Sequence, residues 1–286
     1  MQSVLYLSDL DGTLLDRNAV LPPSDAARIN RLTAEGVMIS FATARTVRSV
    51  SHILSDVDFT HPGAAPVALM NGTMIRDMRE GRYLAVEKIP PDAVRRVLGA
   101  MDETGAEPFV YTVDPARPVE GDPLLTSYRR LANDCMRRFR DERIEKYGKP
   151  FARFSLPEDL PGETVYFCVL GDEALVRRTA AAAEGISGIR QTFYPDAYAE
   201  GVWYLEVFPE TASKRRAVDF LRAYTGADRV VAFGDNRNDL PMFEAADFAV
   251  AVSSAAEEVK AAADDVCRNV TEYIEAERGR DAERFG

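Results

Sequence analysis

The sequence predicts an α/β protein: a Rossmann-like parallel-sheet core with helices on both faces, interrupted by an inserted α+β unit. Near both ends of the chain, short apolar runs alternate with amphipathic segments, which is typical of a parallel sheet with helical crossovers. The stretch between them is rich in proline and mixes strands and helices without that alternation. We therefore expect a core of residues 1–81 and 208–286 and an insertion of residues 82–207.

The first stretch begins with an apolar run at residues 4–7, which predicts a short buried strand. A helix should follow, because Pro22-Pro23-Ser24-Asp25 is typical of a helix start and Gly36 of a helix end. We then expect a strand, a helix and a strand at residues 37–42, 46–54 and 67–70. Asn71-Gly72 should close the last of these strands.

In the insertion, the pattern predicts helices at residues 92–103, 127–140 and 173–184 and strands at residues 109–113, 165–170 and 204–207. The α/β alternation then returns, with a helix, a strand, a helix and a strand at residues 213–224, 230–233, 240–245 and 248–252. A last helical stretch should run through Tyr273, and we expect the charged residues 275–286 to be a frayed tail.

Composition excludes several classes of function. The formal net charge of -11 argues against a nucleic-acid partner, because affinity for a phosphate backbone comes from Lys and Arg. The three cysteines stand far apart and the chain has only two histidines, so a disulfide framework or a zinc site is not expected. No apolar run reaches membrane-spanning or signal length, so we expect a cytoplasmic protein with no membrane partner; the oligomeric state stays open.

Two carboxylates stand at the end of the first predicted strand, in Asp9-Leu10-Asp11-Gly12-Thr13. Residues two apart in an extended segment point to the same side, so Asp9 and Asp11 should converge. Converging carboxylates repel each other unless a cation or a proton lies between them. A plain turn is the alternative, since Asp and Gly are ordinary turn residues.

Three further clusters fall where core strands end or a core helix begins: Thr43-Ala44-Arg45, Lys214, and Gly234-Asp235-Asn236-Arg237-Asn238-Asp239. Because ligands of open parallel sheets bind outside the carboxyl ends of the strands, these distant segments can share one site. Four aspartates would supply the hard oxygen ligands that favour Mg²⁺ over zinc. The hydroxyl of Thr43 and the ammonium group of Lys214 suit a phosphoryl group.

In this order the segments resemble the motifs of the haloacid dehalogenase superfamily. The Asn71-Gly72 step and the large insertion after it are most similar to the Cof-type branch of that family. The resemblance implies a magnesium-dependent phosphatase of a small phosphorylated metabolite, with the insertion acting as a cap domain. The chain departs from the family pattern at Ala44 and Arg215, where glycine is usual.

Carried over residue by residue, the resemblance implies that Asp9 is the nucleophile that becomes an aspartyl phosphate. Asp11 would be the general acid and base, and its backbone carbonyl would bind Mg²⁺. Lys214 would complete the catalytic group and also hold the phosphoryl group. The implied substrate contacts are Thr43, Ala44, Arg45, Asn71 and Lys214, and the implied metal site is Asp9, Asp11, Asp235, Asn238 and Asp239.

Two other functions stay open at this point. Sugar phosphomutases with a similar core and cap use the same first aspartate to move phosphate within a hexose. A binding module on an inactive enzyme core is the other, although no expected catalytic group is missing from this sequence.

Overall fold

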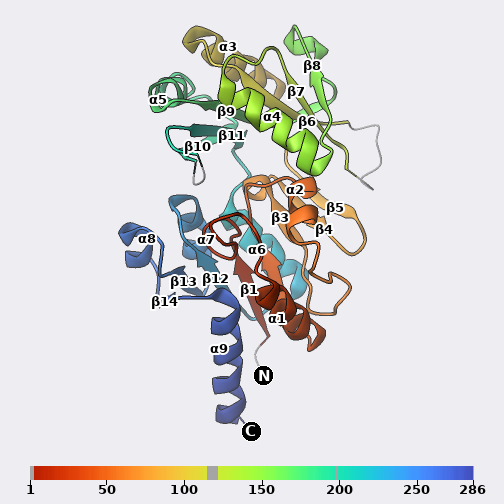
Figure 1. Ribbon diagram of the computed structural model, residues 1–286, viewed down its shortest axis with the longest axis vertical. Helices are drawn as coiled ribbons and strands as arrows, with labels where there is room; N and C mark the ends of the chain where they lie inside the picture. Colours follow the sequence, from red (N-terminus) through yellow and green to blue (C-terminus); the bar gives the residue numbers. More distant parts are fainter. Residues whose placement is uncertain (1–2, 115–121, 197–198, 286) are drawn as a thin grey trace. The chain divides into compact units, whose positions relative to one another are not determined.

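The computed structural model describes residues 3–114, 122–196 and 199–285. The chain divides into two compact units, one made of residues 1–84 and 213–286 and the other of residues 85–212. We call them the core unit and the inserted unit. Figure 1 shows that the core unit is built from the two ends of the sequence, coloured red to orange and cyan to blue.

A five-stranded parallel sheet forms the centre of the core unit, in the order β14-β13-β12-β1-β2. Its strands are β1 (Val4–Ser8), β2 (Met38–Phe41), β12 (Arg229–Gly234), β13 (Phe248–Val252) and β14 (Asp265–Cys267). Every residue from Val230 to Phe233 is fully buried. Such a continuous apolar run fits a strand with helices on both sides of its sheet. The predicted α/β core is confirmed.

The described α-helices of the core unit are α1 (Pro23–Ala34), α2 (Val47–Ile53), α6 (Lys214–Thr225), α7 (Leu240–Ala245), α8 (Glu257–Ala261) and α9 (Val270–Phe285). Helices α6 and α7 pack on each other and on β12, whereas α1 packs on β2 and on α9. Phe233 of β12 contacts the ring of Tyr273 on α9 edge to face. The helices therefore cover both faces, as the sequence predicts.

The predicted third core strand belongs to a separate small sheet. β3 (Val67–Leu69) pairs antiparallel with β4 (Met74–Asp77) in the sheet order β3-β4-β5, where β5 is Arg82–Val86. Isolated parallel bridges, Ile39 with Ala64 and Ala42 with Ala68, and the hydrogen bond from the Ser40 hydroxyl to the carbonyl of Pro66 connect this part of the chain to β2 and the residue after it. The short run ends in the 3₁₀ turn η1 (Met70–Gly72), which reverses the chain before a longer ladder can form.

The inserted unit is a six-stranded sheet, β10-β11-β9-β6-β7-β8, in which all described pairings except β7 with β8 are antiparallel. Its strands are β6 (Pro108–Val113), β7 (Leu124–Tyr128), β8 (Phe151–Arg153), β9 (Glu163–Gly171), β10 (Ile189–Pro195) and β11 (Trp203–Pro209). Helices α3 (Pro91–Thr104) and α5 (Glu173–Ala182) share one apolar cluster with β6, β9 and β11. The ring of Phe139 on α4 (Asp134–Tyr147) stacks on that of Phe109 at 5.0 Å.

Two predicted segments are wrong in detail. Residues 127–128 end strand β7, and α4 begins only at Asp134, where the side chain of Asn133 caps the helix by accepting the N–H of Met136. The charged end is not a frayed tail, because α9 continues to Phe285. Ion pairs to distant parts of the core hold two charged side chains near its start, Glu275 with Arg28 at 3.0 Å and Glu277 with Arg229 at 2.9 Å.

Within the described parts of the chain, no helix combines the length and the apolar character that crossing a bilayer would need.

Candidate active site

Asp9 follows β1 directly and is almost fully buried, with 5% of its surface exposed. Its N–H donates to the carbonyl of Phe233 at 3.0 Å, which extends the β1–β12 ladder by one residue. β12 is itself followed by Asp235, so the parallel pairing brings the two aspartates to the same edge of the sheet. One carboxylate oxygen from each of Asp9, Asp235 and Asp239 lies within 4.8 Å of the others.

Lys214 is the first residue of α6, where the hydroxyl of Ser213 caps the helix by accepting the N–H of Arg216 at 3.0 Å. Its Nζ lies 2.5 Å from Asp9 Oδ1 and 2.6 Å from Asp239 Oδ1, and all three side chains are buried. The other oxygen of Asp239 accepts the N–H groups of Asp235 and Asn236, each at 3.0 Å. Asp239 thus fixes both the lysine and the loop that carries Asp235.

The pKa values of Asp9, Asp235 and Lys214 are shifted because these groups are buried close to one another. Burial raises the pKa of Asp9 well above its ordinary value; the charge of Lys214 opposes the shift, and the neighbouring carboxylates add to it. Burial, assisted by Asp239, also raises the pKa of Asp235 to about 6. Burial disfavours the charged form of Lys214, but Asp239 and Asp9 outweigh it and raise the pKa of the lysine. The ammonium group therefore stays charged beside Asp9 and Asp239, while Asp9 and Asp235 bind a proton more tightly than exposed aspartates do.

Gly12 makes the close approach of the two acidic loops possible. Its φ is +80°, and a Cβ placed there would lie 2.3 Å from Asp235 Oδ2. Next to it, Thr13 donates its hydroxyl to Asp235 Oδ1 at 3.1 Å. This contact of Thr13 is not predicted from the sequence. Only the position of Thr13, four residues after Asp9, indicates that it lies near the site, because its partner is 222 residues away.

Thr43 lies two residues beyond β2 and is buried. Its Oγ1 accepts the N–H of Arg45 at 3.1 Å, which leaves the hydroxyl proton available for donation to a ligand. Ala44 is half-buried, and it is not among the described non-glycine residues with positive φ, so the missing glycine causes no backbone strain. This departure from the family pattern is harmless in the fold.

Asn71 lies in a turn of unusual backbone geometry. Met70, Asn71 and Gly72 have φ values of +51°, +56° and +83°. Hydrogen bonds hold this turn against the Thr43 segment: the N–H of Asn71 donates to the carbonyl of Thr43 at 2.9 Å, and that of Met70 to Arg45 at 3.1 Å. Consecutive left-handed residues cost energy and persist where the surroundings fix them, often at functional sites.

The carboxylate of Asp11 pairs with Arg45 instead of joining the acidic cluster. Arg45 binds both of its oxygens, from Nε to Oδ2 at 2.7 Å and from Nη2 to Oδ1 at 2.6 Å. Asp11 is accordingly not part of the group of three carboxylates, and only its backbone carbonyl could serve a metal there, as the family resemblance implies. The structure thus brings Asp9, Asp235, Asp239 and Lys214 together and pairs Asp11 with Arg45.

The donor set fits a divalent cation. Four carboxylates, of Asp9, Asp11, Asp235 and Asp239, stand against two cations, Lys214 and Arg45, so two negative charges remain when all are ionised. Asn238 Oδ1 is buried without a hydrogen-bond partner. Asn238 precedes Asp239 in the chain, and amide and carboxylate oxygens are the hard ligands that Mg²⁺ prefers.

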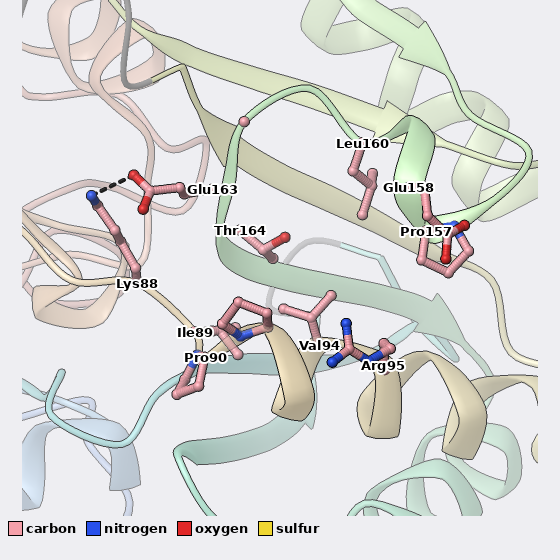
Figure 2. A pocket seen from close by; sticks show the side chains of 12 residues that line it. Lys88, Ile89, Pro90, Val94, Arg95, Pro157, Glu158, Leu160, Glu163 and Thr164 are labelled. Carbon is pink, nitrogen blue, oxygen red and sulfur yellow. Dashed lines mark ion pairs between the residues drawn. The ribbon is translucent and has the colours of Figure 1, made fainter.

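The inserted unit carries a groove of about 320 Å³ that contains none of these residues (Figure 2). Its lining includes Lys88, Ile89, Pro90, Val94, Leu160 and Glu163. Figure 2 shows Lys88 paired with Glu163, to one side of the apolar side chains of Ile89, Pro90 and Val94.

Comparison with known proteins agrees with this fold. The sequence profile of the haloacid dehalogenase-like hydrolases matches residues 6–273. The chain belongs to this family. It resembles a haloacid dehalogenase-like hydrolase of Bacteroides thetaiotaomicron in structure, with a TM-score of 0.75 at 19% identity over 96% of this chain and 99% of the other.

Two curated relatives carry enzyme names. A 5-amino-6-(5-phospho-D-ribitylamino)uracil phosphatase of Bacillus subtilis is 25% identical over 266 residues, which are 88% of each chain. An HMP-PP phosphatase of Klebsiella pneumoniae is 25% identical over 82% of this chain and 78% of its own length. Together with the family match, they support a hydrolase that acts on phosphate esters.

Proposed function

We propose that the chain is a magnesium-dependent phosphatase of small phosphorylated metabolites that works through an aspartyl phosphate on Asp9. The observation that carries the proposal is the position of Lys214 Nζ, 2.5 Å from Asp9 Oδ1 and 2.6 Å from Asp239 Oδ1. A buried carboxylate with a raised pKa is a poor nucleophile while it is protonated, and the lysine favours its ionised form.

In the first step, an oxygen of Asp9 attacks phosphorus while the bond to the leaving oxygen breaks. Asp11 gives its proton to that leaving oxygen. In the second step, a water molecule attacks phosphorus and passes its proton to Asp11, and the bond between Asp9 and phosphorus breaks. Thr43 and Lys214 hold the phosphoryl oxygens through both steps, with Arg45, Asn71 and Ala44 bordering the same site.

Asp9, the backbone carbonyl of Asp11 and Asp235 would hold Mg²⁺, with Asn238 and Asp239 orienting that group. When bound, the ion supplies positive charge that offsets the repulsion among the carboxylates and the phosphate and stabilises charge on the transferring group. The raised pKa of Asp235 and the partnerless Oδ1 of Asn238 support this assignment.

The substrate class follows from the relatives. Their names give a phosphorylated ribityl compound and HMP-PP as substrates, both small phosphorylated molecules. We propose a substrate of that class for this chain, with the inserted unit as the cap domain that selects it. Selection would then depend on residues that carry no motif.

The test is phosphate release from a panel of phosphorylated metabolites: sugar phosphates, phosphorylated flavin precursors and pyridoxal 5′-phosphate. Each compound is assayed with the metal-stripped chain, with Mg²⁺ restored, and with Asp9→Asn. We expect release only from the wild-type chain with Mg²⁺. Full activity in excess chelator would remove the metal from the mechanism, and isomerised hexose phosphate without inorganic phosphate would indicate a mutase instead.

A further inference from the structure

Arg45 binds Asp11 through two hydrogen bonds, one to each carboxylate oxygen, at 2.7 and 2.6 Å. We propose that Arg45, supported by Ser49, is a positioning residue that holds the Asp11 carboxyl group in the orientation for proton transfer. This inference rests on the proposed function, in which Asp11 exchanges a proton with the leaving oxygen and then with water. It replaces direct contact with substrate as the main role of Arg45.

Three hydrogen bonds besides those to Asp11 hold Arg45 in place. Its backbone N–H donates to Thr43 Oγ1 at 3.1 Å, and its carbonyl accepts the N–H of Met70 at 3.1 Å. Its Nη1 donates to the hydroxyl of Ser49, one turn further along in α2, at 2.9 Å. Ser49 is buried, with 7% of its surface exposed. The guanidinium therefore has little freedom to turn away from Asp11.

Asp11 needs such a partner. Its side chain is 32% exposed, against 7% for Asp9, and a carboxylate on that surface would otherwise sample several rotamers. The planar fork of arginine matches a carboxylate in one geometry, which adds orientation as well as energy. Small errors in the placement of an acid–base group can lower a rate about a hundredfold.

The atoms of Arg45 also argue against a primary role in phosphate binding. Nε and Nη2 are used on Asp11, and Nη1 on Ser49. A bidentate grip on phosphate would require the guanidinium to leave the carboxylate. In contrast, the two hydrogen bonds to Asp11 fix the plane of its carboxyl group.

If Arg45 positions Asp11, its loss should affect the reaction rate differently for different leaving groups; if Arg45 binds phosphate, the loss should be the same for all of them. p-Nitrophenolate leaves without a proton, whereas an alkyl oxygen needs one from Asp11. Rapid mixing would measure the first burst of leaving-group release from p-nitrophenyl phosphate and from the alkyl phosphate that the wild-type chain cleaves fastest. The variants are Arg45→Lys, which keeps the charge and loses the fork, and Ser49→Ala, which removes the support.

We expect Arg45→Lys to slow the alkyl burst about a hundredfold and the p-nitrophenolate burst less than about threefold. Ser49→Ala should also slow the alkyl burst more than the p-nitrophenolate burst, but by a smaller factor than Arg45→Lys. Later turnover should fall with both substrates, since the water step needs Asp11 in each case. Arg222→Ala is the matched control, because Arg222 pairs with Asp247 at 2.7 Å in the same unit; both of its bursts should be unchanged.

An equal loss in both bursts would overturn the proposal and assign Arg45 to the phosphate itself, most clearly if KM rises as well. Unchanged bursts in both variants would also overturn it. Failure of the proposed function looks different, because the wild-type chain would then show no burst, or Asp9→Asn would still show one. Melting temperatures of all variants separate a folding defect from either result.

Discussion

Thr13 Oγ1 donates a hydrogen bond of 3.1 Å to Oδ1 of Asp235 and so joins the loop after β1 to the loop after β12. The bond lowers the pKa of Asp235, against the larger effect of burial. Thr13 thus favours the ionised form of one proposed metal ligand without being a ligand itself.

Thr13→Val removes this hydroxyl at nearly constant volume. We expect the dissociation constant of Mg²⁺ to rise about threefold to tenfold, corresponding to about 1 kcal/mol, because Asp235 binds its proton more tightly without the donor. Titration of the metal-stripped chain with Mg²⁺ measures the change. Thr60→Val is the matched control, since Thr60 donates to Asp58 at 2.6 Å on the exposed surface; an equal effect there would contradict the assignment.

The pKa of Asp235 also predicts how metal binding depends on pH. Burial raises this pKa from 3.8 to about 6, so below that pH a proton competes with the cation. Protonation of Asp235 should therefore raise the apparent dissociation constant of Mg²⁺ about tenfold for each pH unit below 6, and protonation of Asp9, whose pKa is also raised, adds to this rise. Asp235→Asn should flatten the profile, and a wild-type profile that is already flat would contradict the role of Asp235.

The same shift has a consequence for stability. Between about pH 4 and 6 the metal-free folded chain holds a proton on Asp235 that the unfolded chain has released, so the free energy of unfolding falls as pH rises through this window. Mg²⁺ should restore that stability once Asp235 is ionised. We expect melting curves to show a clear gain with Mg²⁺ at about pH 7.5 and almost none at about pH 5; equal gains would be inconsistent with this linkage.

Gly72 tests the contact between the left-handed turn and the start of α6. A Cβ at this position would lie 2.3 Å from the carbonyl oxygen of Ser213, next to Lys214. Gly226 ends the same helix with φ +69° and no atom near its Cβ position, so Gly226→Ala should cost only the backbone strain, about 1 kcal/mol. Gly72→Ala should lower the free energy of unfolding by about 2 kcal/mol more and reduce phosphate release as well. Equal losses in urea unfolding would show that the contact is not restrictive.

The sequence predicts the parallel core well, because its strands are short apolar runs and helices α1, α6 and α7 carry Pro at their starts or Gly at their ends. The sequence does not predict β14, nor strands β7 and β8 before and after α4. β14 has three residues and no alternation, and the segment before Asn133 has a charged composition that also suits a helix. The tail is misjudged because the partners of its charges, such as Arg28 and Arg229, are distant in sequence.

In the site too, some features can be predicted from the sequence and others cannot. The position of Asp9 after one strand and of Asp235 after its neighbour follows from parallel topology, so their proximity can be anticipated. The partners of individual side chains cannot, since hydrogen bonds such as those from Arg45 to Asp11 and from Thr13 to Asp235 depend on rotamers that only the packed structure sets. The left-handed φ of Asn71 is likewise fixed by tertiary contacts to the Thr43 segment.

The most direct test of the central claim is to find the phosphoryl group on the chain itself. Acid quenching of the first turnover, followed by peptide mass spectrometry, should detect a phosphoryl adduct on the peptide that contains Asp9. The adduct should disappear in Asp9→Asn while the variant keeps its fold by circular dichroism. A phosphoryl group on any other residue, or turnover by Asp9→Asn at the wild-type rate, would contradict Asp9 as the nucleophile.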